Sequence, residues 1–423
     1  MVSFLLILTL IFISGASDSR QTVPAKEVLA EIDGHKTVSY KSVIIAGDLI
    51  LDGASSGSIV YPITVVDCDI EGDVRFDNSV LARPINFEKT RFNGSVSFDG
   101  TRFLGCANFS QCEFRRSASF RGAMFRGPTS FGRAIFRSFS TFREAVFDGT
   151  LADFHASDFK DYASFNFASF HVEKADFEGS KFEGDANFQQ AEFKGRAVFL
   201  GSAFRGLADF DRSRFNTTSE FLGARFYDEL HLNGVDYNVF DITWDSIRHR
   251  LVCDEPGYIA LVVNFKKLGR FDEADNCYYQ YREWMRINRP LQDWAGTIWD
   301  LLAWVSCGYG VRWTHTLLSA IFILLLFALY YGISESRRTL RELLPGEGSV
   351  KITYKGLKRE LHSTVLLSTI CLLSLPWEMY PYGHVAYTRF VKRHFFAVIL
   401  ERILGWALML LLIGVITRLF VRY

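Results

Sequence analysis

Between Phe87 and Phe226, a phenylalanine recurs every five or six residues with almost no exception. The steps alternate 5, 6, 5, 6 up to Phe147, and the count resumes after single inserted residues at Phe154 and Phe177. Helices repeat near 3.6 residues and strands at 2, so neither has this period. A fixed longer period indicates a solenoid, in which each short coil buries its apolar residues against the next coil. The sequence therefore predicts that nearly half of the chain is one solenoid.

The residue two positions before most of these phenylalanines is small, as Ala107 and Ala118 are. One large and one small side chain are thus expected to point inwards in each unit. The positions that follow each phenylalanine are mostly glycine or charged, which suits an exposed corner. The predicted core includes Phe109, Phe114, Phe120, Phe125, Phe131, Phe136, Phe188, Phe193, Phe199 and Phe204.

The unit small-x-Phe-x-x, as in Ala186-Asn187-Phe188 and Ala208-Asp209-Phe210, resembles the pentapeptide-repeat family. This resemblance covers residues 44–240 and implies an all-β, right-handed, quadrilateral β-helix with one phenylalanine per side. The family's usual unit is a strict five, whereas the alternation here predicts about 22 residues per coil. Over about eight coils, a spacing of about 4.8 Å gives a solenoid roughly 40 Å long. Within residues 18–43, Lys26–Gly34 is expected to be a capping helix, and Val43–Leu51 the first strand.

The apolar run at the start of the chain ends in Ser14-Gly15-Ala16, so residues 1–17 are predicted to be a signal peptide. An uncleaved signal anchor stays open, because no Lys or Arg precedes the run. Either way the protein is expected at the cell membrane, with its repeat domain extracellular. Asn93, Asn108 and Asn216 are then candidate glycosylation sites, since each begins an Asn-x-Ser/Thr motif.

The charges of the chain balance, with 47 basic and 47 acidic residues, but they are unevenly placed. Arg102 to Arg143 holds eight arginines and one acid, whereas Asp148 to Glu192 holds ten acids and three lysines. Some pentapeptide-repeat proteins are acidic mimics of DNA. A dipolar solenoid behind a signal peptide argues against that role, and no nucleic-acid partner is expected. The basic segment is either a patch for an anionic polymer or a solvated face.

Residues 241–289 are predicted to be helical. Trp244–Leu251 is expected to cap the solenoid, and Tyr258–Leu268 and Phe271–Ile287 to form a hairpin that resembles a single tetratricopeptide-type pair. The first hairpin helix is predicted to have one apolar face, made of Ile259, Leu261, Val262, Phe265 and Leu268. Residues 290–315 are a membrane-proximal segment, in which Cys307–Gly310 is expected to be a turn.

Residues 316–333 and 395–421 are apolar and long enough to be transmembrane helices, which makes the lipid bilayer a predicted partner. The loop 334–362 is basic and is therefore expected in the cytoplasm. Ser363–Trp377 is short for a span, and residues up to 383 disfavour a helix. This is the layout of a re-entrant segment over 363–383. A third full crossing is the alternative.

This arrangement, with Glu401 and Gly405 in the second span, resembles the two-helix pore of potassium-type channels over residues 315–423. Together with the repeats, the chain resembles a group of archaeal exported pentapeptide-repeat proteins with a channel-like tail. The filter motif Thr-Val-Gly-Tyr-Gly is absent, so the filter is degenerate. Glu401 and Arg402 are either functional or interfacial anchors, and Glu378 is the candidate for attracting cations. The pore-loop candidates are Pro376, Trp377, Glu378, Met379 and Tyr380.

No phosphate loop, nucleophile elbow or His-Glu-x-x-His motif is present, so we expect no enzyme, and no catalytic, metal-binding or cofactor-binding residues. The sequence favours a membrane-anchored surface protein with a binding or scaffold role, an unknown extracellular ligand and a degenerate channel-like anchor. The alternative is an oligomeric cation channel, a homotetramer, whose repeat domain forms an outer vestibule or sensor.

Overall fold

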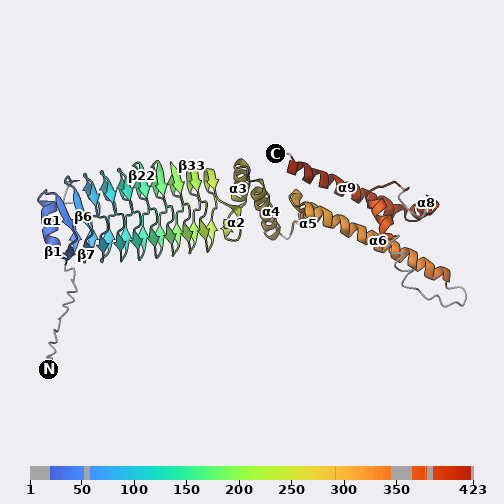
Figure 1. The fold of residues 1–423 in the computed structure, drawn as a ribbon, viewed down its shortest axis with the longest axis horizontal. Coiled ribbons are helices and arrows are strands. Elements are labelled where there is room, and N and C mark those ends of the chain that lie inside the picture. Colours follow the sequence, from blue (N-terminus) through green and yellow to red (C-terminus); the bar gives the residue numbers. More distant parts are fainter. Residues whose placement is uncertain are drawn as a thin grey trace, which may run out of the picture. The chain divides into compact units, whose positions relative to one another are not determined.

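The computed structural model describes residues 20–51, 58–290, 292–343, 364–376, 378 and 384–420. The predicted signal peptide lies outside these residues. The chain divides into two units, Met1–Leu268 and Gly269–Tyr423, and each is described by itself. The first unit is a solenoid of short parallel strands, and the second is made of helices (Figure 1).

Four columns of strands form the sides of the solenoid, and every pair of neighbours in a column is parallel. The first column is β1 (Thr22–Pro24), β3 (Ile44–Ala46), β7 (Asp69–Ile70), β11 (Arg91–Phe92), β15 (Glu113–Phe114), β19 (Ile135–Phe136), β23 (Asp158–Phe159), β27 (Lys181–Phe182), β31 (Ala203–Phe204) and β34 (Arg225–Phe226). The second column is β4 (Leu49–Ile50), β8 (Val74–Arg75), β12 (Val96–Ser97), β16 (Ala118–Ser119), β20 (Ser140–Thr141), β24 (Ala163–Ser164), β28 (Ala186–Asn187), β32 (Ala208–Asp209), β35 (Leu230–His231) and β37 (Leu251–Val252).

The other two columns merge at the C-terminal end, where one long strand runs round a corner. One is β2 (Val38–Lys41), β6 (Ile63–Val66), β10 (Ile85–Asn86), β14 (Ala107–Asn108), β18 (Thr129–Ser130), β22 (Leu151–Asp153), β26 (Lys174–Asp176) and β30 (Arg196–Val198). The other is β5 (Ser58–Ile59), β9 (Val80–Leu81), β13 (Arg102–Phe103), β17 (Met124–Phe125), β21 (Val146–Phe147), β25 (Ser169–Phe170), β29 (Glu192–Phe193), β33 (Arg214–Glu220) and β36 (Asp236–Asp241). Strand β33 pairs with both β29 and β30, which joins the two columns.

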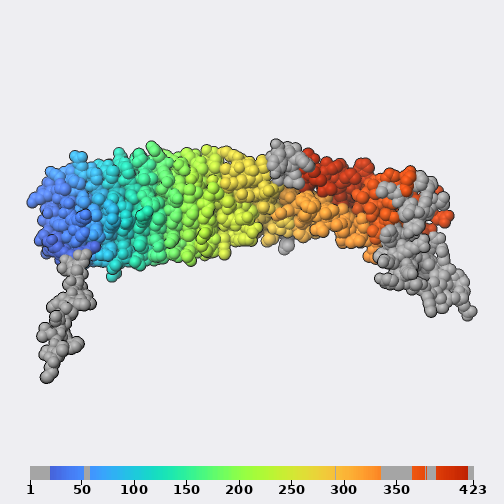
Figure 2. All heavy atoms as spheres, in the orientation of Figure 1, coloured from blue at the N-terminus to red at the C-terminus, as the bar shows by residue number. Residues whose placement is uncertain are grey.

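The register of the strands fixes the length of a coil. Phe92 pairs with Phe114, 22 residues later, and Phe136 pairs with Phe159, 23 residues later, where one residue is inserted. The two complete columns have ten strands each, so the solenoid has about ten turns and is longer than the eight coils expected. Strands β1, β2 and β37 lie beyond the predicted limits of the repeats. Successive coils stack in sequence order, as the colours of Figure 2 follow.

The core of the solenoid is a stack of phenylalanine rings. All ten predicted core phenylalanines are completely buried. Rings one coil apart lie parallel, as Phe114 and Phe136 do with centroids 4.7 Å apart and an interplanar angle of 6°. Neighbouring sides meet edge to face, as Phe114 and Phe120 do at 88°. Both arrangements are favoured by the charge distribution of aromatic rings, so the stacked rings stabilise one coil against the next.

The backbone explains why steps of five and six alternate. In the five-residue steps, the second residue after the phenylalanine is left-handed, as in Gly122, Arg133 and Glu144, with φ near 60°. In a six-residue step such as Phe103–Phe109 no residue has a positive φ. A left-handed residue turns the chain sharply, and one residue fewer then completes the corner.

Helices lie at both ends of the solenoid. At the N-terminal end, α1 (Ala25–Asp33) buries Ala25, Val28 and Ile32. The predicted capping helix Trp244–Leu251 is shorter than expected, because α2 ends at Ile247 (Trp244–Ile247) and residues 251–252 form β37.

The C-terminal edge is capped by α3 (Glu255–Lys267). The buried Asn264 side chain accepts a hydrogen bond from Phe240 N at 3.0 Å and donates one to Phe240 O at 2.7 Å. It therefore takes the place of a neighbouring strand and satisfies backbone groups that the sheet edge would leave open. The apolar face predicted for this helix is partly wrong, because Ile259 is half exposed and Asn264 is buried in its stead.

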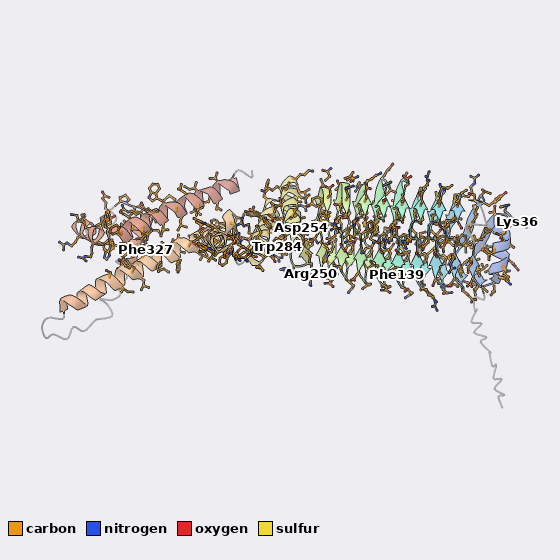
Figure 3. All side chains as sticks on the ribbon, turned by 180° about the vertical axis from the view of Figure 1, so that it is seen from behind. Lys36, Phe139, Arg250, Asp254, Trp284 and Phe327 are labelled. Atoms are coloured by element: carbon orange, nitrogen blue, oxygen red, sulfur yellow. The ribbon has the colours of Figure 1, made fainter. Side chains whose placement is uncertain are left out.

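The second unit contains α4 (Phe271–Ile287), α5 (Trp294–Cys307), the short 3-10 turn η1 (Gly308–Gly310), α6 (Trp313–Leu343), α8 (His384–Arg393) and α9 (Phe395–Phe420). A further helix covers residues 364–372. It packs with α6, α8 and α9 around a buried cluster that includes Leu367, Ile370, Phe390 and Phe327, the last of which is labelled in Figure 3.

Two stretches of these helices, Trp313–Ser334 and Phe395–Thr417, are long and apolar enough to cross a membrane. Only 22% of each stretch is buried within the protein, so the apolar side chains mostly point outwards. A core helix of a soluble protein is mostly buried, so this exposure favours a lipid environment.

Candidate functional site

The buried polar residues of the helical unit meet around Glu401, whose side chain is completely buried. Tyr331 of α6 donates a hydrogen bond to Glu401 Oε2 at 2.8 Å, and Ser368 of the 364–372 helix donates one to Oε1. One carboxylate of α9 thus connects three helices. This burial excludes the interfacial anchoring that the sequence left open for Glu401, because an anchor would place its charge at the water surface.

Arg402, the neighbour of Glu401, points in a different direction. Its Nη2 donates a hydrogen bond to Tyr387 Oη of α8 at 2.7 Å. Adjacent helical residues lie about 100° apart, so the two charged side chains serve different contacts. Glu401 holds the 364–372 helix, whereas Arg402 holds α8.

The end of the 364–372 helix lies directly against α9. A Cβ atom added to Gly405 would be 1.9 Å from Leu372 O, so only glycine allows this approach. One residue later in α9, Trp406 Nε1 donates a hydrogen bond to Ser374 Oγ at 2.9 Å. The backbone of Ser374 is in the left-handed conformation, with φ 51°, and begins the turn away from the helix.

Of the pore-loop candidates, Pro376 and Glu378 are exposed, and Trp377, Met379 and Tyr380 lie outside the described residues. The residues before them, 364–372, are helical where the structure describes them.

A second buried cluster lies at the other end of the helical unit, around Asp300 of α5. The Asp300 side chain is almost completely buried, 2.5 Å from Arg282 Nη2 of α4 and 2.7 Å from Tyr309 Oη of η1. Burial and the hydrogen bond to Asp300 raise the pKa of Tyr309 to about 12. The turn expected at Cys307–Gly310 is thus a 3-10 turn that carries a buried tyrosine.

Asp300 is not among the functional residues predicted from the sequence. The signal was present, since Asp300 is the one acid between Trp294 and Cys307. A single carboxylate inside an apolar helix requires a partner, and Arg282 supplies it from the preceding helix.

On the solenoid, stacking brings Asp209, Asp211 and His231 together. One ligand atom from each lies within 4.8 Å of the others, so the three could hold a metal ion. Burial raises the pKa of Asp209. The same oxygen atoms also serve the coil structure, because Asn233 donates to Asp211 Oδ1 from both its backbone and its side chain. Sequence spacing did not reveal the group, since His231 belongs to the next coil.

The arginine-rich segment does not form one patch. Arg115 and Arg137 follow strands of the first column and contact the same carboxylate, Glu113. Arg121 follows the second column and Arg126 another side of the solenoid. A coil of 22 residues spreads neighbouring arginines over all its sides, which favours the solvated face over a binding patch.

The three glycosylation candidates differ in accessibility. Asn216 is exposed on β33. Asn108 is half-buried, and its Nδ2 donates a hydrogen bond to Oδ1 of Asn86 in the preceding coil at 3.0 Å. Asn93 has a buried Oδ1. The amide nitrogen is the atom that would carry a glycan, so the geometry favours Asn216.

Comparison with known proteins identifies the repeats. Residues 87–135, 109–158, 167–213 and 188–236 match the family model of pentapeptide repeats (9 copies). No curated protein and no solved structure gives a significant match to the chain. The chain therefore carries a pentapeptide-repeat β-solenoid of about ten turns, followed by a helical region with two apolar helices that could span a membrane.

Proposed function

We propose that the protein is a non-catalytic surface protein of the cell membrane. In this proposal, α6 and α9 anchor the chain in the lipid bilayer, and the repeat solenoid is displayed outside the cell for binding or as a scaffold. The observation that carries the proposal is the outward apolar surface of these two helices. Leu318, Phe322 and Leu410 are each more than 60% exposed, which is costly in water and favourable in lipid.

The solenoid supports a role in binding through its outer surface. Its interior is filled by phenylalanine rings that stack from coil to coil, which leaves little space for a small molecule between them. A ligand would instead meet ladders of outward side chains that stack in register from coil to coil, as Arg91 with Glu113 and Asp158 with Lys181 do. The structure of such a ladder suits an extended partner with a matching repeat.

Export rests on the sequence of residues 1–17, and orientation on the predicted basic loop 334–362, whose first residues, up to Leu343, form the end of α6. That loop favours the cytoplasm, which places the start of α6 and the solenoid outside. The test is protease protection of intact spheroplasts and of inverted membrane vesicles that contain the full chain. Cleavage of the solenoid in spheroplasts, with protection in inverted vesicles, would support the proposal. Protection in spheroplasts, or recovery of the chain in the soluble fraction, would contradict it.

A cation channel is the second candidate, favoured by the position of the 364–372 helix. Its described residues lie between α6 and α9, and it ends against Gly405. Two spans cannot enclose a pore alone, so a homotetramer would be needed. The test is the current through planar bilayers that contain the full-length protein. Discrete cation-selective currents that are smaller in Glu378→Gln would support a channel. The absence of current after verified insertion would support the membrane anchor instead.

A further inference from the structure

Helix α5 has an apolar face that the helical unit leaves uncovered. Trp294 is 70% exposed, and Ile298, Leu301, Leu302 and Val305 are about half exposed. These residues follow one another at intervals of 4, 3, 1 and 3, so they line one side of the helix. Trp299, beside them, is 73% exposed.

The other side of α5 is already occupied within the unit. Asp300 is held by Arg282 and Tyr309, and the ring of Trp304 lies under the guanidinium of Arg286 at 4.8 Å. Trp304 Nε1 also donates a hydrogen bond to Tyr279 Oη at 2.8 Å. Helix α5 therefore cannot rotate to hide its apolar side without breaking a buried ion pair.

The apolar face continues the surface of the candidate span. Only the η1 turn and two residues separate α5 from α6, and Ser319 Oγ of α6 donates a hydrogen bond to Val305 O at 2.6 Å. The first turns of α6 are exposed and apolar, at Trp313, Leu317 and Leu318. With 14 residues, α5 is about 21 Å long, too short to cross a hydrocarbon core of about 30 Å.

We propose that α5 is an interfacial membrane helix, whose apolar face is embedded in the leaflet where α6 begins. The partner is the phospholipid bilayer itself. Trp294, Trp299 and Trp313 carry indole groups of the kind enriched at membrane interfaces, and the opposite face of α5 packs against α4 and η1. This inference rests on the proposed membrane anchoring. It makes α5 part of the membrane domain, beyond the two spans.

The test places a photoreactive benzoylphenylalanine in the full-length protein at Ile298 or at Leu302. The protein is reconstituted in vesicles of phosphatidylcholine and phosphatidylglycerol that carry a fluorescent phosphatidylcholine. Leu318 on α6 is the positive control, and Leu104, exposed on the solenoid, is the negative control. Crosslinks to the fluorescent lipid at positions 298, 302 and 318, with none at 104, are expected.

The outcomes separate the two proposals. Lipid crosslinks at 318 without any at 298 and 302 would overturn the role of α5 and keep the anchor. Crosslinked dimers at 298 or 302, without lipid, would identify a second copy as the partner and overturn the inference. The absence of lipid crosslinks at 318 would overturn both.

A second measurement avoids the bulky probe. Brominated phosphatidylcholine quenches tryptophans that lie in the bilayer, so Trp299→Phe is expected to lower the quenched fraction of the total emission. Trp244→Phe is the control, because Trp244 is buried at the end of the solenoid and its removal should raise that fraction. An unchanged or increased quenched fraction in Trp299→Phe would contradict the proposal.

Discussion

Gly405 of α9 lies so close to Leu372 that a Cβ atom at position 405 would be 1.9 Å from the Leu372 carbonyl oxygen. This contact fixes the end of the 364–372 helix against the second candidate span. The sequence had singled out Gly405 as part of a channel-like resemblance. The structure gives it a physical role, which is the close approach of two backbones.

Gly405→Ala is therefore expected to push the 364–372 helix away from α9. Overpacking of this kind costs about 1–3 kcal/mol. Thermal unfolding of the full-length protein in detergent would show a lower midpoint. Gly414→Ala, in the same helix, is the matched control, because a Cβ there meets no atom within 4 Å. Equal effects of the two substitutions would show that the Leu372 contact is not important.

Phe165→Ala is expected to destabilise the solenoid by about 3–5 kcal/mol, because it leaves a cavity in the aromatic stack. Phe165 is completely buried, whereas Phe167, two residues later, is 40% exposed and left-handed. Phe167→Ala should change the urea midpoint much less. The measurement is far-UV circular dichroism of both variants in urea. Similar midpoints would contradict the predicted role of the repeated phenylalanines.

Glu401→Ala is expected to leave Tyr331 without its acceptor and Ser368 with only Leu324 O, and to lower stability by about 1–3 kcal/mol. The glutamine of Glu401→Gln keeps one acceptor oxygen, so this substitution should lower stability less than Glu401→Ala does. The thermal midpoint in detergent, with the exposed Glu378→Ala as control, measures the difference. If Glu401→Ala unfolded at the same temperature as the control, the carboxylate would not be what connects the three helices.

Acid should weaken the N-terminal coils of the solenoid. The hydrogen bond from Arg91 holds the pKa of Asp69 below its usual range, and Arg20 also lies 3.3 Å from Asp69. A carboxyl whose pKa is lowered on folding stabilises the protein above its unfolded pKa, about 4, and loses this effect as pH falls through the lower folded value.

Arg91→Gln should therefore lower stability by about 1 kcal/mol or less at neutral pH, and the difference should shrink as the pH falls below about 4. Urea midpoints measured at several pH values test this. Arg102→Gln, another exposed arginine on the solenoid, should show no such convergence. A difference for Arg91→Gln that is independent of pH would refute the ion-pair explanation.

When the full chain is expressed through a eukaryotic secretory pathway, Asn216 is expected to be glycosylated and Asn108 is expected to stay unglycosylated. The reason is exposure, because Asn216 is accessible and the Asn108 amide is bonded to Asn86. A glycosidase-sensitive mobility shift that disappears in Asn216→Gln would agree. A shift that disappears only in Asn108→Gln would contradict it, and no shift at all would count against export of the solenoid.

The spacing of the phenylalanines predicted the solenoid, because a repeating core depends only on local periodicity, and the resemblance to pentapeptide repeats added the four sides and hence the 22-residue coil. The lengths of two apolar segments likewise predicted the two candidate membrane spans. The number of coils was underestimated, because the first and last strands carry no phenylalanine and are recognised only by their pairing, as Thr22–Pro24 with Ile44–Ala46.

The tertiary structure alone decided the polar contacts. Asn264 caps the sheet edge at Phe240, Asp300 pairs with Arg282, and Glu401 accepts hydrogen bonds from residues 70 and 33 positions earlier. A hydrogen bond needs two groups in one place with a defined direction, and residue spacing does not supply that information across separate helices. A repeat determines where the next ring lies, whereas a buried carboxylate depends on how distant helices pack.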